Sequence, residues 1–213
     1  YENAIPAELR QGYRRMTEAQ TRALRLEYSK FFVFGGEESY GYLAQDFVRD
    51  KDANAAAICL AEMNAYLASK GISLLECLNS IYTQLGYYKE LGTNIVMEGA
   101  DGAAKIAALT KSYIENPPTT MDGTNVAGVR DFSSGKMIDV EGDPVPAEKM
   151  LFIDLADGRS FAVRPSGTEP KIKFYLFAHG NAGEELATAR PAVEASIAAL
   201  WKAVEADAYA RMA

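Results

Sequence analysis

Histidine and cysteine are scarce in this sequence of 213 residues, which contains only His179, Cys59 and Cys77. A single histidine and the absence of a C-x-x-C pair do not predict a zinc centre or a disulfide framework. The two cysteines lie in apolar segments with helical spacing, so we expect two buried, reduced thiols.

Long apolar runs and a surplus of positive charge are also missing. No run approaches the roughly 20 residues required to span a bilayer, and the N-terminus lacks the charged-then-apolar pattern of a secretory signal. The formal net charge of -7 argues against a general binder of nucleic acid or anionic membranes. We expect a cytoplasmic protein in which any bound anion is held by local groups.

The apolar pattern divides the chain near residues 86–100. In the first part, the short apolar run 31–34 ends at two glycines and predicts a buried strand. The Ala-rich segment 52–69 is apolar on most sides, which predicts a largely buried helix. A second helix is indicated by the capping-box spacing of Ser73 and Glu76. Its apolar residues form one stripe that we expect to face a core: Leu74, Leu78, Ile81, Tyr82 and Leu85.

The second part combines several short strands with helices on either side. Alternating apolar residues predict strands over 94–97, 126–131, 150–155, 160–164 and 171–177, and a helix over 102–113. Pro191 is expected to start or kink a long final helix, whose apolar face contains Val193, Ile197, Leu200, Trp201 and Val204. This pattern predicts a compact α+β domain with a small antiparallel sheet and flanking helices.

The stretch "RPSGTEPKIKFY", residues 164–175, gathers cations and hydroxyls in an acidic protein. Gly167 between two hydroxyl residues would let main-chain N–H groups turn inward around an anion. Arg164 adds a planar fork suited to phosphate oxygens, and Lys171 adds a point charge. The alternative is a polar hairpin turn whose lysines alternate outward from the apolar residues of a half-solvated strand.

A second loop, "GGEESYGYL" at residues 35–43, follows the short apolar run. Its carboxylates and serine suit the vicinal hydroxyls of a sugar, although a simple strand-to-helix connection with solvated acids would look the same. In the following "VRDKD", Arg49 and Lys51 can neutralise a phosphate or pair with neighbouring aspartates. The residues alone leave these alternatives open.

Taken together and in this order, "FGGEESYGYL", "VRDKDA", "VRDFSSG" and "RPSGTEPKIKFY" resemble the C-terminal part of the α-D-phosphohexomutase superfamily, in particular its phosphoglucomutase-like branch. The resemblance covers about residues 31–213. It implies that residues 1–90 are the C-terminal part of the third, sugar-binding α/β domain, with 1–30 poorly matched. Residues 91–213 would be the C-terminal phosphate-binding α+β domain.

The resemblance also implies roles for individual residues. Glu37 and Ser39 would hold the sugar hydroxyls O3 and O4, and Lys51 would lie near the reacting centre as a phosphate contact or an acid/base participant. The residues implied to hold the phosphate that is not transferred are Arg164, Ser166, Gly167, Thr168 and Lys171.

Two motifs of the family are absent from this sequence: the T-A-S-H-N-P-like loop with the phosphoserine and the D-x-D-x-D-R-like loop that binds Mg²⁺. The resemblance implies an intramolecular phosphotransferase that needs Mg²⁺ and glucose 1,6-bisphosphate and acts on a phosphorylated hexose. We expect this chain to be a C-terminal fragment of such an enzyme, inactive without the N-terminal domains and binding neither cofactor itself. The alternatives are a stand-alone, non-catalytic module that binds phosphorylated sugars, and a structural domain whose loops are only turns.

Overall fold

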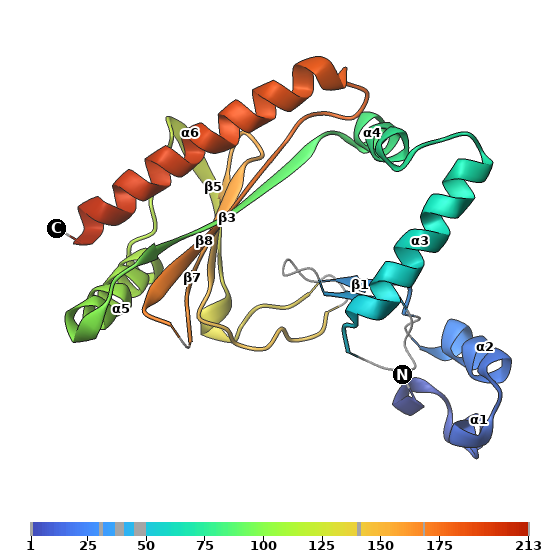
Figure 1. Cartoon of the computed structure of the whole chain (residues 1–213). Coiled ribbons are helices and arrows are strands. Elements are labelled where there is room, and N and C mark those ends of the chain that lie inside the picture. Colours follow the sequence, from blue (N-terminus) through green and yellow to red (C-terminus); the bar gives the residue numbers. More distant parts are fainter. Residues whose placement is uncertain are drawn as a thin grey trace. The chain divides into compact units, whose positions relative to one another are not determined.

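The computed structural model describes residues 2–29, 32–36, 41–44, 50–139, 142–167 and 169–212. The chain divides into two compact units, Tyr1–Cys77 and Leu78–Ala213. Figure 1 labels the elements of both, and each unit is described by itself.

The first unit contains short helices and one two-stranded ribbon. Its elements are η1 (Glu2–Ala4), α1 (Ala7–Arg10), η2 (Tyr13–Arg15), α2 (Glu18–Tyr28), β1 (Gly35–Gly36), β2 (Tyr42–Leu43) and α3 (Ala53–Ser69). Thr17 caps α2 through a capping box with Gln20, and the Asp52 side chain accepts a hydrogen bond from the Asn54 N–H at the start of α3. Local polar caps therefore fix where these helices begin.

Three sequence predictions about the first unit are wrong. Leu67 is the one described residue of α3 that is buried, while Ile58 and Met63 are exposed. Residues 32–34 form no strand, and Val33 is 80% exposed. Cys59 is exposed and Cys77 is half-buried. In each case an apolar pattern gives the preference of a segment for burial, but burial also requires a partner. Among the described elements of this unit, α3 packs mainly against β2.

Helix α4 (Leu74–Leu85) begins as predicted, because the Glu76 N–H donates to Ser73 Oγ and the Ser73 N–H donates to the Glu76 carboxylate. The prediction that its apolar stripe faces a core is wrong. Leu78, Ile81 and Leu85 are exposed. Of the residues in this stripe, Tyr82 is the one that packs against the hydrophobic core.

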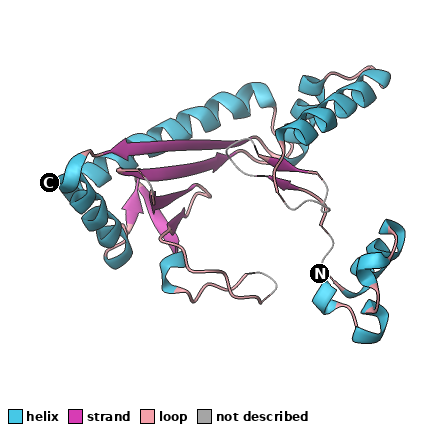
Figure 2. Ribbon diagram, turned by 60° about the horizontal axis from the view of Figure 1, so that its bottom comes forward, coloured by secondary structure: helices cyan, strands magenta, loops and turns pink. Residues whose placement is uncertain are grey.

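The second unit is built on a six-stranded antiparallel sheet in the order β3-β8-β7-β6-β5-β4. Its elements are β3 (Tyr88–Val96), α5 (Gly99–Glu115), β4 (Thr120–Met121), β5 (Thr124–Asp131), η3 (Phe132–Ser134), β6 (Leu151–Leu155), β7 (Ser160–Pro165), β8 (Lys171–His179) and α6 (Leu186–Met212). Figure 2 shows α6 running alongside the long strands. The predicted α+β arrangement of sheet and flanking helices is confirmed.

One face of this sheet forms the core together with α5 and α6. Alternate residues of β8 and β6, such as Phe174 and Ile153, are fully buried, as the period of a strand requires. The predicted apolar face of α6 is confirmed, since Val193, Ile197, Leu200 and Val204 are all buried. Of the two roles predicted for Pro191, the start of the helix is wrong, because α6 already begins at Leu186 and contains the proline; a kink at Pro191 stays a prediction.

Candidate functional site

The loop at residues 166–170 joins β7 to β8 and is closed by its own hydrogen bonds. The Ser166 N–H donates to the Lys171 carbonyl oxygen at 2.9 Å, and the Lys171 N–H donates to the Glu169 carbonyl oxygen at 2.7 Å. The Ser166 hydroxyl oxygen accepts a hydrogen bond from the Glu169 N–H at 3.2 Å. These bonds order the main chain of Ser166, Glu169 and Lys171, which lowers the entropic cost of ordering these residues around a ligand.

Arg164 lies at the end of β7, opposite Lys173 of β8 in the strand register. Its strand neighbour Val163 is buried in the core, so the side chain of Arg164 projects from the face of the sheet that is opposite the core. The Arg164 Nε donates to Glu148 Oε1 at 3.1 Å. The pKa of Arg164 is raised, first by this hydrogen bond and also by its contact with Tyr175.

Lys171 carries the second positive charge of the loop and lies on the same face of the sheet, because it alternates with the buried Ile172. Its Nζ lies 2.6 Å from Glu169 Oε2. The hydrogen bond and the charge of Lys171 hold the pKa of Glu169 below its ordinary value. Both predicted cations are therefore in contact with a carboxylate in this structure.

Gly167 lies in open space, since a Cβ placed on it would meet nothing within 4 Å. It does not have the positive φ that the described glycines of several other turns have. The N–H groups of Ser166 and Glu169 are used inside the loop, so these two do not point at a shared anion here. Thr168, Glu37 and Ser39 lie outside the described residues.

Lys51 belongs to the first unit, and Val48 and Arg49 of the same "VRDKD" segment lie outside the described residues. Its Nζ lies 3.6 Å from Asp50 Oδ1, and 53% of its side chain is exposed. Its main-chain N–H also donates to the Asp50 carboxylate at 2.9 Å. The structure thus gives Lys51 an aspartate partner at the surface. Arg164, Ser166, Gly167 and Lys171 come together in one loop of the second unit.

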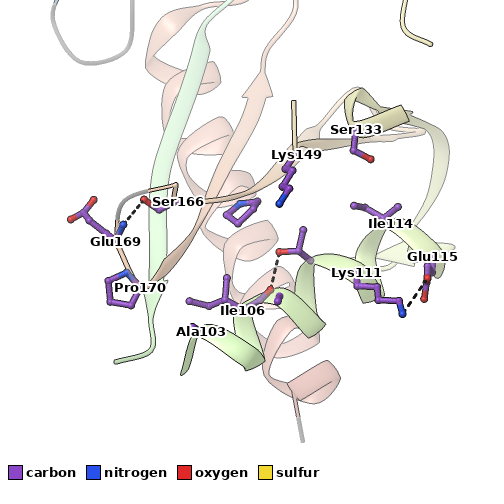
Figure 3. Close-up of a pocket in the computed structure, with 13 residues that line it drawn as sticks. Ala103, Ile106, Lys111, Ile114, Glu115, Ser133, Lys149, Ser166, Glu169 and Pro170 are labelled. Carbon is purple, nitrogen blue, oxygen red and sulfur yellow. Dashed lines mark hydrogen bonds and ion pairs between the residues drawn. The ribbon is translucent and has the colours of Figure 1, made fainter. Parts of the chain in front are cut away.

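A hollow of about 500 Å³ lies between α5 and the other side of this loop (Figure 3). Its floor is apolar and includes Ile106 and Ile114, and the side chain of Lys149 is directed toward it. Ser166 lines the hollow as well. Lys149 and Glu148 were not predicted as site residues. The signal in the sequence is weak, since both residues lie in the short segment before β6, an interior strand of the sheet.

Neither a metal site nor a membrane-spanning element is found in the part of the chain that the structure describes. Within those residues, no group of three or more His, Cys, Asp and Glu side chains is arranged to hold a metal ion. None of the described helices has the length and apolar content needed to cross a membrane.

Comparison with protein families gives two matches in consecutive parts of the chain. Residues 94–195 match the family described as "Phosphoglucomutase/phosphomannomutase, C-terminal domain". Residues 15–85 match "Phosphoglucomutase/phosphomannomutase, alpha/beta/alpha domain III". The chain belongs to the phosphohexomutase superfamily. The predicted fold class, part of an α/β domain followed by an α+β domain, is confirmed by these matches.

Members of this superfamily with curated descriptions are similar to the chain over most of its length. The phosphoglucomutase of Staphylococcus epidermidis is 36% identical over 181 residues, which are 83% of this chain and 32% of the relative. The phosphoglucomutase of Staphylococcus haemolyticus is 37% identical over 161 residues, which are 73% of this chain and 29% of the relative. The chain therefore spans about a third of the length of these curated relatives.

Among solved structures, the chain is similar to a crystal structure of the exocytosis-sensitive phosphoprotein pp63/parafusin, a phosphoglucomutase from Paramecium, in its open form. The TM-score is 0.52 at 16% sequence identity, and the match covers 84% of this chain and 30% of that protein. At this identity the likeness supports the fold alone.

Proposed function

We propose that this chain is the C-terminal part of a phosphohexomutase that interconverts hexose 1-phosphate and hexose 6-phosphate through a bisphosphate. The chain supplies recognition of the sugar and of the phosphate that is not being transferred, and it is inactive alone. The observation that carries the proposal is the closed loop after β7, in which Arg164, Ser166 and Lys171 come together at the end of the sheet. The same loop lies within the matched C-terminal domain.

The chemistry of this loop fits the role of a phosphate holder. A guanidinium can bind two phosphate oxygens at once, and a lysine adds a charge without a fixed direction. The Ser166 hydroxyl can donate to a phosphate oxygen while its oxygen accepts the Glu169 N–H. Holding one phosphate orients the other one for transfer, and such positioning lowers a reaction barrier by several kcal/mol.

The first unit would hold the sugar. In this proposal Glu37 and Ser39 bind the hydroxyls O3 and O4, and Lys51 contacts a phosphate or takes part in proton transfer. Binding through the hydroxyls O3 and O4 distinguishes glucose from mannose only weakly, because these sugars differ at C2. The domain assignment used here is residues 1–90 for the sugar-binding part and 91–213 for the phosphate-binding part, and the expected location is the cytoplasm.

Mg²⁺ and glucose 1,6-bisphosphate are the cofactors expected for the whole enzyme. A bound Mg²⁺ neutralises negative charge as a phosphoryl group moves. The described residues do not fit a metal site, so we assign the metal and the nucleophilic serine to N-terminal domains of the same enzyme. The partners of this chain are then those domains and the phosphorylated hexose.

A crystal of the chain soaked in glucose 6-phosphate tests the proposal. We expect the phosphate in contact with Arg164, Ser166 and Lys171. A phosphate found only in the hollow beside Lys149, or no bound phosphate at all, would overturn the assignment of the loop. Calorimetry with the same ligand separates the alternative: a site shared with other domains binds weakly, whereas micromolar affinity in the isolated chain favours a stand-alone binding module.

A further inference from the structure

Glu148 is held in a fixed position beside the candidate phosphate loop. Its N–H donates to the Phe132 carbonyl oxygen at 3.1 Å, and its own carbonyl oxygen accepts a hydrogen bond from the Met150 N–H at 2.7 Å. The first bond ties the segment before β6 to η3, and the second is a local bond within that segment. The main chain of Glu148 is therefore held next to the end of β7, while its half-exposed side chain can change rotamer.

The contact of Glu148 with Arg164 uses an atom that a phosphate would also use. The carboxylate accepts from Nε at 3.1 Å, and the Nε edge of an arginine is one of the two edges that bind anions bidentately. The side chains of Arg164 and Glu148 are 40% and 49% exposed. A ligand can thus reach the guanidinium from solvent, and the carboxylate can swing away without leaving a buried charge unpaired.

We propose that Glu148 sets the phosphate affinity of the loop by occupying Arg164 until a phosphate dianion replaces it. This inference rests on the proposed function and adds a residue that the loop motif does not contain. A phosphate monoester dianion offers three terminal oxygens and twice the charge of the carboxylate that it displaces. Any anion that takes this edge of Arg164 has to displace Glu148, so the contact weakens the binding of each such anion by about the same factor.

The same competition limits how tightly a phosphate is held. In the proposed reaction the two phosphates of a bisphosphate have to exchange places, which requires the loop to release one and take the other. A carboxylate that is ready to return to Arg164 offsets part of the cost of that release. Glu148 is therefore expected to weaken phosphate binding, which is the opposite of the effect of an ordinary binding residue.

Glu148→Gln is the informative variant, since glutamine keeps an oxygen that can accept from Arg164 Nε but removes the charge. The measurement is a titration of the whole chain with inorganic phosphate, followed by the amide signals of Ser166 and Gly167 in ¹H–¹⁵N NMR spectra. Exposed ion pairs are worth up to about 1 kcal/mol, so we expect the Kd for phosphate to fall by up to about fivefold. A parallel titration with acetate should show weaker binding than phosphate in both proteins and a gain in the variant by a similar factor, because acetate has to displace the same carboxylate.

Asp154→Asn is the matched control. This carboxylate is on β6, and it is held by Arg130 through two hydrogen bonds at 2.7 and 2.8 Å. The control makes the same change in net charge, and we expect its Kd to stay within about 1.5-fold of the wild type, because a charge without direct contact is screened by solvent. An equal fall in the Kd for phosphate in both variants would mean that net charge alone affects binding, and would overturn the role of Glu148.

Arg164→Ala separates this inference from the proposed function. If phosphate still shifts the loop signals in Arg164→Ala, the assignment of the loop itself fails. If Arg164→Ala abolishes the shifts but Glu148→Gln leaves the Kd unchanged or raises it, the proposed function stands and the role of Glu148 fails. Unchanged spectra for the core residues of each variant establish that it is folded.

Discussion

The main-chain N–H of Met97 donates a hydrogen bond to the carbonyl oxygen of Pro170 at 2.9 Å. Met97 follows β3 and leads into α5, and Pro170 is the last residue before β8. The bond extends the ladder between β3 and β8 by one step beyond the pair Val96 and Lys171. The candidate phosphate loop is therefore anchored on the side of α5 as well as by the hydrogen bonds within it.

Gly102→Ala should disturb this anchor. A Cβ at Gly102 would collide with the main-chain carbonyl of Met97, and the backbone would have to move. Alanine favours a helix more than glycine does, but overpacking costs about 1–3 kcal/mol, so we expect a net loss of stability in urea denaturation. The loop amide signals should shift as well.

Gly92→Ala is the control for this change. Gly92 lies in β3, where an added Cβ meets nothing within 4 Å. We expect its free energy of unfolding to stay within about 0.5 kcal/mol of the wild type. Equal stability of Gly102→Ala and Gly92→Ala would show that the contact at Met97 does not constrain the loop.

Leu200→Ala tests the core of the second unit. Leu200 is completely buried on α6, and the loss of its side chain leaves a cavity that typically costs about 2–5 kcal/mol. Leu85→Ala makes the same chemical change on α4 at a site that is 65% exposed. We expect this second variant to differ from the wild type by less than about 0.5 kcal/mol. A similar loss of unfolding free energy in the two variants would contradict the described packing.

Asp157 should make stability depend on pH. Partial burial alone would raise its pKa, but hydrogen bonds from Arg159 and Thr124 outweigh burial and hold the pKa below the ordinary 3.8. A carboxylate with a lowered pKa in the folded state stabilises the protein above its unfolded pKa, and this contribution is lost as the pH falls through the folded value.

Asp157→Asn should therefore be less stable than the wild type at pH 6, and the difference should shrink below about pH 4. Urea denaturation at pH 6 and pH 3 measures both values. Carboxylates that titrate in both proteins cancel in this comparison. A difference that stays constant between the two pH values would mean that the charge of Asp157 does not stabilise the fold.

The elements that follow from local pattern were predicted well. Leu151 and Ile153 alternate along β6, and Val193 and Ile197 recur along α6, because one face of each element packs on the same core. The capping box of Ser73 and Glu76 depends on neighbouring residues only, and it is present. The predicted strand at 94–97 is the end of a longer strand, β3, whose first half is ordered by pairing with β8.

Features that depend on a distant partner were not predicted. The apolar residues of α3, such as Ile58, indicate a preference for burial, but no pattern along the helix tells which element covers it. At the candidate site, the motif marks Arg164 and Lys171, whereas the partner Glu148 lies 16 residues before Arg164. That pairing follows from the register of β6 against β7, which the sequence does not display.

The most direct test of the account is the kinetic effect of Arg164→Ala in the full-length phosphohexomutase that we propose contains this chain. A lost charge-assisted hydrogen bond costs about 1.5–3 kcal/mol, so kcat/KM for glucose 1-phosphate should fall about 10- to 100-fold. Lys149→Ala removes the same charge on the side of the hollow and should change kcat/KM by less than about threefold. Near-normal turnover of Arg164→Ala, or an equal loss in Lys149→Ala, would contradict the assignment of the loop as the holder of the phosphate.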